Sequence, residues 1–285
     1  MSIQTIGVVG AGSMGSGIAN LAALNGFHVI LRDIEDRFVE GALSRMDKFM
    51  SKSVERGKMT EEQKQETFAR IQITTNLEEM KDADIVIEAV LEDMALKKEV
   101  FFLLDEITRA DVILATNTSS MSITEIASAT KRPDRVAGMH FFNPAQLMKL
   151  VEVVRGFETS AETVEVLKAL STRLKKEVVE VKKDSPGFIV NRIMIPQFIE
   201  AIRLLQEGVA TEEDIDKAVK FGLNYPMGPF ELQDFAGVDI GYYVMEYFQK
   251  EFNDSRFAPP LLIKQMVRAG RHGKKTGAGF YDYNK

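Results

Sequence analysis

Short runs of apolar and β-branched residues alternate with longer amphipathic stretches along the first two-thirds of the chain. This alternation is typical of a parallel sheet whose strands are joined by crossover helices. The first crossover helix is expected at residues 14–24, because Gly26 supplies a stop signal directly after it. The apolar runs predict strands at residues 5–10, 28–33, 71–74, 84–89, 112–116, 136–141, 150–154 and 177–181.

A highly charged segment, residues 35–70, interrupts this alternation between the second and third predicted strands. The segment has helical periodicity, is broken at Gly57, and resumes at Thr60, whose spacing to Gln63 is that of a capping box. We therefore predict an inserted helical hairpin at about residues 35–70, longer than an ordinary crossover connection.

The strand pattern ends near residue 185, and helical patterns follow it. Residues 188–207 form a long apolar stretch with Pro196 inside it, where we expect a kink. The change predicts two domains. The first, residues 1–184, is an α/β domain with a Rossmann-type, doubly wound and mostly parallel sheet; the second, residues 185–285, is all-α.

Composition narrows the class of protein. With 45% hydrophobic and 27% charged residues the chain is of the soluble globular type, and its net charge of -6 gives no reason to expect nucleic acid. We find no apolar run of about 18 residues and no signal-peptide pattern, so we expect a cytoplasmic protein without a membrane partner. The absence of cysteine removes disulfides, thiolate metal ligands and a cysteine nucleophile, and no metal is expected.

A glycine-rich loop, Gly10-Ala11-Gly12-Ser13-Met14-Gly15, follows the first predicted strand and opens the first predicted helix. In this context the spacing predicts a dinucleotide site, in which glycines permit a tight turn and bring backbone N–H groups to a pyrophosphate. The alternative is a purely structural turn. Asp33 ends the second strand, where its carboxylate would accept hydrogen bonds from the adenosine ribose and favour NAD, while Arg32 beside it leaves NADP open.

The chain contains three histidines, so each was considered as an acid/base group. His28 begins a strand at the end of the sheet away from the glycine loop, and His272 lies in a hydrophilic turn. His140 ends a strand, and in open α/β sheets ligands lie at the carboxyl ends of strands. His140 is therefore the best-placed candidate, with an ordinary core histidine as the alternative.

Glu152 lies within the apolar run 150–154, where an ionised carboxylate is unfavourable unless it is paired. A histidine on the neighbouring strand would be such a partner, and the carboxylate would then fix the imidazole tautomer. We predict a His140–Glu152 pair. The alternatives are a solvent-facing Glu152 or its pairing with Lys149 or Arg155.

Further polar residues follow other predicted strands or open the helical domain. They could contact a nicotinamide, its ribose or a substrate oxygen, or simply cap helices. These residues are Glu92, Asn117, Ser119, Asn143 and Asn191.

The order of these motifs resembles the 3-hydroxyacyl-CoA dehydrogenase family, most of all its bacterial 3-hydroxybutyryl-CoA dehydrogenase branch. The resemblance spans essentially the whole chain, and residues 138–144 and 184–192 carry more specific motifs than the glycine loop. The matching stretches are residues 8–15, 87–90, 116–120, 138–144, 148–153, 184–192, 225–232 and 273–281.

This resemblance implies an NAD(P)-dependent oxidoreductase that interconverts (S)-3-hydroxyacyl-CoA and 3-ketoacyl-CoA, with 3-hydroxybutyryl-CoA and acetoacetyl-CoA as short-chain substrates. By position, His140 would be the general base and Glu152 its orienting partner, while Ser119 and Asn191 would contact the substrate oxygen. Ser51 and Lys58 in the hairpin match positions that contact coenzyme A. The implied dinucleotide contacts are Gly10, Gly12, Ser13, Met14, Gly15, Asp33, Glu92, Lys97, Asn117, Ser119 and Asn143.

Two rival functions stay open: a two-domain dehydrogenase of a free β-hydroxy acid, and a non-catalytic dinucleotide-binding protein. The first typically uses a lysine as its acid/base group, which the position of His140 disfavours. A homodimer formed through the helical domain is also expected, as in the family, because that domain has many apolar positions. These are Ile193, Ile195, Phe198, Ile202 and Leu205.

Overall fold

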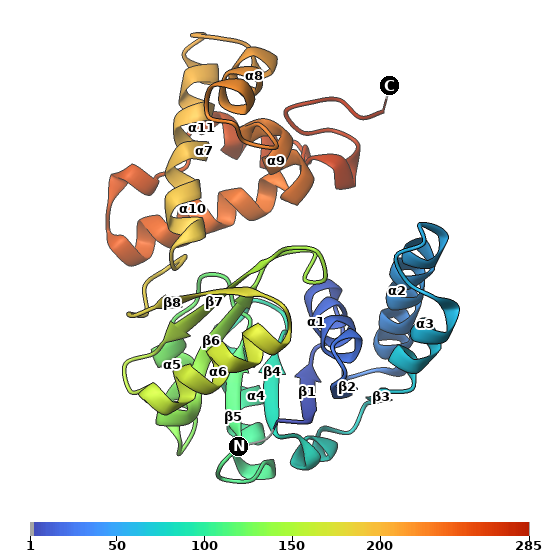
Figure 1. Ribbon diagram of the computed structural model, residues 1–285. Helices are drawn as coiled ribbons and strands as arrows, with labels where there is room; N and C mark the ends of the chain where they lie inside the picture. The colour runs from blue at the N-terminus through green and yellow to red at the C-terminus, as the bar shows by residue number, and fades with distance from the viewer. Residues whose placement is uncertain (1–2, 285) are drawn as a thin grey trace. The chain divides into compact units, whose positions relative to one another are not determined.

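The computed structural model describes residues 3–284 and divides the chain into two compact units, Met1–Phe188 and Ile189–Lys285. Figure 1 shows the first unit, in blue to yellow, as a sheet with helices around it, and the second, in orange to red, as a group of helices. The boundary predicted at residue 185 lies close to this division.

The first unit contains one eight-stranded sheet with the order β3-β2-β1-β4-β5-β6-β7-β8. Each pair of neighbouring strands is parallel except β6 and β7, which are antiparallel, so the predicted mostly parallel sheet is confirmed. The strand order changes direction between β1 and β4, where ligands of such sheets bind. The strands are β1 (Thr5–Val9), β2 (His28–Arg32), β3 (Ile71–Thr74), β4 (Ile85–Glu88), β5 (Ile113–Thr116), β6 (Val136–Phe141), β7 (Leu150–Arg155) and β8 (Glu177–Val181).

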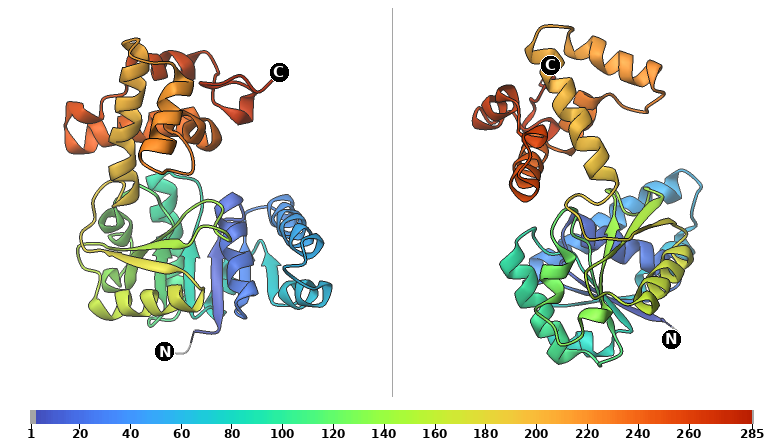
Figure 2. Two further views of the ribbon diagram at one scale, coloured as in Figure 1. Left: turned by 45° about the horizontal axis from the view of Figure 1, so that its top comes forward. Right: turned by 90° about the vertical axis from the view of Figure 1, so that its left-hand side faces the viewer.

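Helices cover both faces of this sheet, which explains why its central strands are almost continuously apolar. Every residue of β4, β5 and β6 is buried. The helices α1 (Ser13–Leu24) and α6 (Ala161–Arg173) share one core, while α4 (Met94–Ile107) and α5 (Ile123–Ala127) share another. Figure 2, right, shows the two layers of helices on either side of the strands. Two 3₁₀ turns, η1 (Leu77–Asp82) and η2 (Pro133–Arg135), precede strands.

The charged segment after β2 forms the predicted hairpin of α2 (Asp36–Glu55) and α3 (Glu61–Phe68). Gly57 turns the chain with a φ of 66°, a left-handed conformation that favours glycine. Thr60 and Gln63 form the predicted capping box, with the Thr60 hydroxyl accepting from the Gln63 N–H at 3.1 Å. One face of α2 is apolar and packs into the same core as α1, which holds the hairpin on the sheet domain.

The second unit is built from α7 (Val190–Gln206), α8 (Glu212–Gly222), α9 (Pro229–Ala236), α10 (Val238–Phe252) and α11 (Leu261–Arg268), with 3₁₀ turns η3 (Ser255–Phe257) and η4 (Lys274–Thr276). It has an apolar core of its own. Pro196 lies inside α7. Asp216 of α8 accepts hydrogen bonds from the Phe230 and Glu231 N–H groups and so caps α9. None of the helices described in residues 3–284 has the length and apolar character needed to cross a bilayer.

Candidate active site

The glycine loop lies between β1 and α1, at the carboxyl edge of the sheet. Gly10 has a φ of 103°, and a Cβ there would lie 2.5 Å from the Ala89 carbonyl oxygen. A Cβ on Gly15 would lie 1.7 Å from the Gly10 oxygen, whereas the space beside Gly12 is open. Gly12 is the N-cap of α1 and brings no side chain, and the first turn holds no acidic residue. The loop therefore leaves the helix N-terminus accessible to an anion and fits a dinucleotide pyrophosphate.

Asp33 follows β2 and turns its carboxylate toward this loop. One carboxylate oxygen accepts the Ala11 N–H at 2.6 Å and the other accepts the Ile34 N–H at 2.7 Å. Arg32 instead donates to the Thr75 carbonyl, at the end of β3. Because Arg32 is directed at the neighbouring strand, Asp33, directly after β2, is the charged side chain that meets the glycine loop.

Arg45 of the hairpin also reaches the glycine loop, which the sequence did not predict. Its guanidinium donates to the Ala11 carbonyl oxygen and to the Ser16 hydroxyl. The charged surface of α2 gave no signal that would single out this arginine, because its partners are backbone and hydroxyl oxygens far away in sequence.

His140 and Glu152 lie directly opposite each other on the antiparallel strands β6 and β7. The His140 Nδ1 is 2.7 Å from a Glu152 carboxylate oxygen, and the residues are 5% and 0% exposed. Arg155, the alternative partner, pairs with Glu180 at 2.8 Å. With its Nδ1–H donated to the carboxylate, the imidazole keeps a lone pair on Nε2 that can take up a proton.

Residues after β4, β5 and β6 surround this position at the same edge of the sheet. Asn117 accepts the Phe141 N–H at 2.9 Å and so holds the end of β6 beside β5. Glu92 accepts the Ser119 N–H at 3.0 Å and contacts its hydroxyl at 3.4 Å. Asn143 is exposed in the connection after β6, where it precedes a cis proline. The structure thus brings the predicted Glu92, Asn117 and Ser119 into one hydrogen-bonded group of loops.

The remaining predicted site residues lie outside this group of loops. Lys97 is buried, with its ammonium 2.8 Å from Glu88 and 3.3 Å from Glu92. In the hairpin, the Ser51 hydroxyl accepts from Lys64 at 2.9 Å and Lys58 is exposed in the turn after α2. Asn191 lies in the first turn of α7 and so belongs to the second unit.

Glu88 is a second residue that the sequence prediction missed. It ends the fully buried strand β4 and is completely inaccessible to solvent. The reasoning that singled out Glu152, a carboxylate in an apolar strand, applies equally to Glu88. Glu88 was not singled out because it lies near the end of the predicted strand, where polar residues are common and need not be buried.

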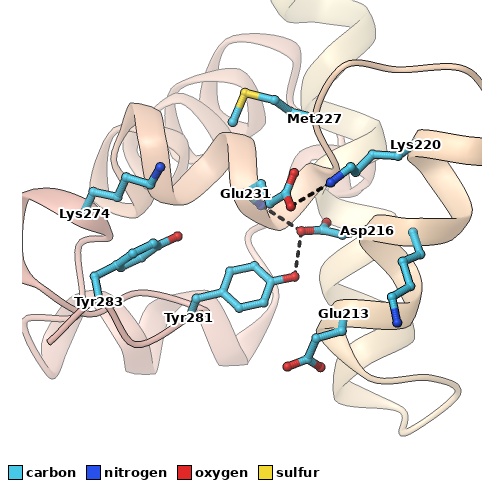
Figure 3. A pocket seen from close by; sticks show the side chains of 9 residues that line it. Glu213, Asp216, Lys220, Met227, Glu231, Lys274, Tyr281 and Tyr283 are labelled. Atoms are coloured by element: carbon cyan, nitrogen blue, oxygen red, sulfur yellow. Dashed lines mark hydrogen bonds and ion pairs between the residues drawn. The ribbon is translucent and has the colours of Figure 1, made fainter. Parts of the chain in front are cut away.

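A pocket of about 530 Å³ lies in the second unit and is shown in Figure 3. Its polar groups bind one another: the Tyr281 hydroxyl donates to Asp216 at 2.7 Å, and Lys220 pairs with Glu231 at 3.0 Å. None of the residues predicted from sequence lines it. Over residues 3–284, no cluster of three or more histidine or carboxylate side chains is arranged to hold a metal ion.

The chain matches two family models end to end. Residues 5–185 match the NAD binding domain of 3-hydroxyacyl-CoA dehydrogenase, and residues 187–283 match its C-terminal domain. It is 48% identical to a 3-hydroxybutyryl-CoA dehydrogenase of Clostridioides difficile over 98% of this chain and 99% of that protein. It is 43% identical to one of Mycobacterium tuberculosis over 99% of both.

A solved structure agrees with these matches. The crystal structure of (S)-3-hydroxybutyryl-CoA dehydrogenase from Ralstonia eutropha superposes with a TM-score of 0.96 at 44% identity, covering 100% of both chains. Both halves of the chain, its sheet and its helical unit thus have counterparts in the same group of enzymes. The chain belongs to the 3-hydroxyacyl-CoA dehydrogenase family.

Proposed function

We propose that the protein interconverts (S)-3-hydroxyacyl-CoA and 3-ketoacyl-CoA with NAD, using 3-hydroxybutyryl-CoA and acetoacetyl-CoA as its short-chain substrates. The observation that carries this proposal is the buried His140–Glu152 pair at the edge of the sheet that also holds the glycine loop. The names of the similar proteins, 3-hydroxybutyryl-CoA dehydrogenases, support the substrate class.

The dinucleotide would be held by the glycine loop, Asp33 and the residues after β4, β5 and β6. Backbone N–H groups of residues 12–14 would bind the pyrophosphate, and Asp33 the adenosine ribose. Glu92, Ser119 and Asn143 would surround the nicotinamide end. The bound nicotinamide supplies the hydride acceptor or donor of the reaction. Arg32 donates to the Thr75 carbonyl and so is not turned toward a 2′-phosphate, whereas the Asp33 carboxylate would repel one. We therefore expect a preference for NAD over NADP.

His140 would transfer the proton. Its Nε2 takes the proton from the 3-hydroxyl during oxidation, and the resulting imidazolium returns it to the carbonyl oxygen during reduction. Glu152 keeps the Nδ1–H oriented and stabilises the imidazolium. Ser119 and Asn191 would hydrogen-bond the reacting oxygen. A positioned acid/base group of this kind contributes roughly 10²–10⁴-fold to the rate.

The coenzyme A part of the substrate would lie against the hairpin. Ser51 and Lys58 are the expected contacts, and further basic residues of the same segment suit the phosphates of coenzyme A. These are Lys48, Lys52 and Arg56.

A homodimer would form through the second unit. Ile195, Phe198 and Ile202, which suggested this interface from sequence, lie in the core of that unit instead. Other apolar side chains of the same unit are exposed and would form the interface: Ile193 is 59% exposed and Phe221 84%. Light scattering of the purified protein tests this, since a monomer at micromolar concentration contradicts the proposed dimer.

The decisive experiment compares His140→Gln with wild type. The variant is expected to bind NADH normally in a fluorescence titration but to lose most acetoacetyl-CoA reduction, roughly 10²-fold or more. His28→Gln is the matched control, because His28 is exposed at the opposite end of the sheet. Full turnover by His140→Gln overturns the mechanism.

The rival functions are separated by the choice of substrate. Wild type is assayed with acetoacetyl-CoA, a longer 3-ketoacyl-CoA and free acetoacetate, each with NADH and with NADPH. Activity on free acetoacetate alone would identify a dehydrogenase of free acids, and no activity with NADH binding retained would identify a non-catalytic protein. A higher kcat/KM with NADPH contradicts the assignment of Asp33.

A further inference from the structure

Three charged side chains of the sheet domain contact one another in sequence, from a buried carboxylate to an accessible one. Glu88 at the end of β4 is 0% exposed, Lys97 in the first turns of α4 is 1% exposed, and the Glu92 side chain is 40% exposed. The Lys97 ammonium lies 2.8 Å from a Glu88 oxygen and 3.3 Å from a Glu92 oxygen. One buried cation therefore joins a buried carboxylate to an accessible one.

Glu88 is held on both of its oxygens. The oxygen that binds Lys97 also accepts the Val90 N–H at 2.6 Å, and the other accepts the Thr116 hydroxyl at 2.7 Å. A buried carboxylate requires such partners, because an ionised group without them is strongly destabilising. Glu88 thereby connects the turn after β4, the start of α4 and the end of β5.

The accessible end of this series of contacts meets the loops that the reaction would use. Glu92 accepts from the Thr118 hydroxyl at 2.5 Å and from the Ser119 N–H at 3.0 Å. On the other side, the turn fixed by the Val90 bond packs against Gly10, where a Cβ would lie 2.5 Å from the Ala89 oxygen. Glu88 therefore contacts the Ser119 loop through Lys97 and Glu92, and the glycine loop through the turn at Val90.

We propose that Glu88 is a positioning residue, whose buried carboxylate holds Lys97 so that Lys97 in turn fixes Glu92 and the Ser119 loop for dinucleotide binding. Lys97 is 1% exposed and lies between the two carboxylates, so its ammonium links Glu88 to Glu92. This inference rests on the function proposed above, because it takes Glu92 and Ser119 as dinucleotide contacts.

The test compares Glu88→Gln with Asp105→Asn. Asp105, at the other end of α4, is also a buried carboxylate and pairs with Arg132 at 2.6 Å, so its substitution removes a comparable ion pair away from the edge. Glu88→Gln is expected to raise the Kd for NADH, read from NADH fluorescence, and its KM about tenfold, the effect of losing one charged hydrogen bond. Asp105→Asn is expected to keep the Kd for NADH and the KM values for NADH and acetoacetyl-CoA within about twofold of wild type.

A purely structural role predicts a different pattern. Lower stability alone reduces the active fraction and hence the apparent kcat, but it leaves the NADH Kd and both KM values unchanged. The inference is therefore overturned if Glu88→Gln binds NADH within about twofold of wild type, or if Asp105→Asn weakens NADH binding equally. Denaturant unfolding of both variants tests whether their stabilities are comparable.

A double variant covers the case in which Glu88→Gln does not fold. Glu88→Gln with Lys97→Met removes both buried charges together, which is far less destabilising than leaving one unpaired. It is expected to fold yet keep the raised Kd for NADH, because Glu92 has lost its cation; normal NADH binding by this variant overturns the inference. A wild type that binds NADH but does not reduce acetoacetyl-CoA contradicts the proposed function instead.

Discussion

Two individual carboxylates, Glu152 and Glu88, organise the carboxyl edge of the sheet. Glu152 and Glu88 are both completely buried in strands, and each is compensated by specific donors instead of by solvent. Proteins retain such groups only where the partners are well placed, because a buried unpaired charge is strongly destabilising. Here the partners are an imidazole in one case and a lysine with a threonine in the other.

Glu152→Gln is predicted to lower kcat by roughly 10²-fold. The amide keeps the shape of the side chain but can donate to Nδ1, which places the imidazole hydrogen on Nε2, where a proton must be accepted. The KM values are expected to change little, since Glu152 is too deeply buried to contact substrate. Steady-state rates with acetoacetyl-CoA measure this.

Glu180→Gln is the control for that prediction. Glu180 lies on β8 and pairs with Arg155 at 2.8 Å, and this guanidinium holds the pKa of Glu180 below its usual range. Its neutralisation is expected to leave kcat unchanged. Equal losses of kcat in the two variants would show that Glu152 supports the structure of the sheet and does not orient His140.

At the scale of elements, the connection between β6 and β7 depends on a buried lysine. Lys176 is 8% exposed, and its ammonium donates to the Ala145 and Met148 carbonyls, both at 2.7 Å. The same connection carries Asn143, and it packs on α1, where a Cβ on Gly17 would lie 3.1 Å from the Gln146 side chain. Lys176 thus holds a predicted dinucleotide contact in place.

Lys176→Met is predicted to lower the free energy of unfolding at neutral pH by about 1–3 kcal/mol, because two carbonyls lose their donor. Burial lowers the pKa of Lys176 from its ordinary value of 10.5. Between the folded pKa and 10.5, the unfolded chain binds the proton more tightly, so wild-type stability rises with pH relative to the variant.

Urea unfolding from pH 7 to pH 10 tests both statements, with Lys175→Met as the exposed neighbouring control. The difference in unfolding free energy between wild type and Lys176→Met should grow toward the alkaline end. A difference that does not vary with pH would mean that Lys176 keeps its ordinary pKa in the folded protein.

At the scale of the whole molecule, the two units have separate cores, and the predicted dinucleotide contacts belong to the first. In the second unit, Asp234 ties the C-terminal segment to α9. It is 1% exposed and accepts the Phe280 and Tyr281 N–H groups at 2.9 Å and the Tyr283 hydroxyl at 3.0 Å. Burial and the Asp234 charge raise the pKa of Tyr283.

Asp234→Ala is predicted to destabilise the second unit by roughly 2–5 kcal/mol, since a buried N–H, a partly buried N–H and a tyrosine hydroxyl lose their acceptor. Hydrogen exchange should accelerate within residues 189–284, while NADH binding persists. Turnover is expected to fall, because Asn191, the proposed substrate contact, belongs to this unit. Asp282→Ala, an exposed carboxylate of the same segment, is the control. Loss of NADH binding together with faster exchange in residues 3–188 would contradict the prediction that the second unit can be destabilised without the first.

Much of the fold follows from the sequence, because strand and helix patterns report local burial. The eight strands, the hairpin with its Thr60 cap and the change to helices after the sheet were all predicted from periodicity and turn residues. The glycine loop and its following Asp33 were equally visible, since their function depends on backbone conformation and short spacing. Each of these features is determined within a few neighbouring residues.

The tertiary structure decided which side chains meet. The short connection after β6 makes β7 antiparallel, and the resulting register, not the sequence spacing, sets Glu152 opposite His140. Packing between segments that are distant in sequence likewise places Lys97 against Glu88 and buries Ile195 in the core of the second unit. Local patterns show that a residue is buried, but its partner depends on strand order, register and packing between distant segments.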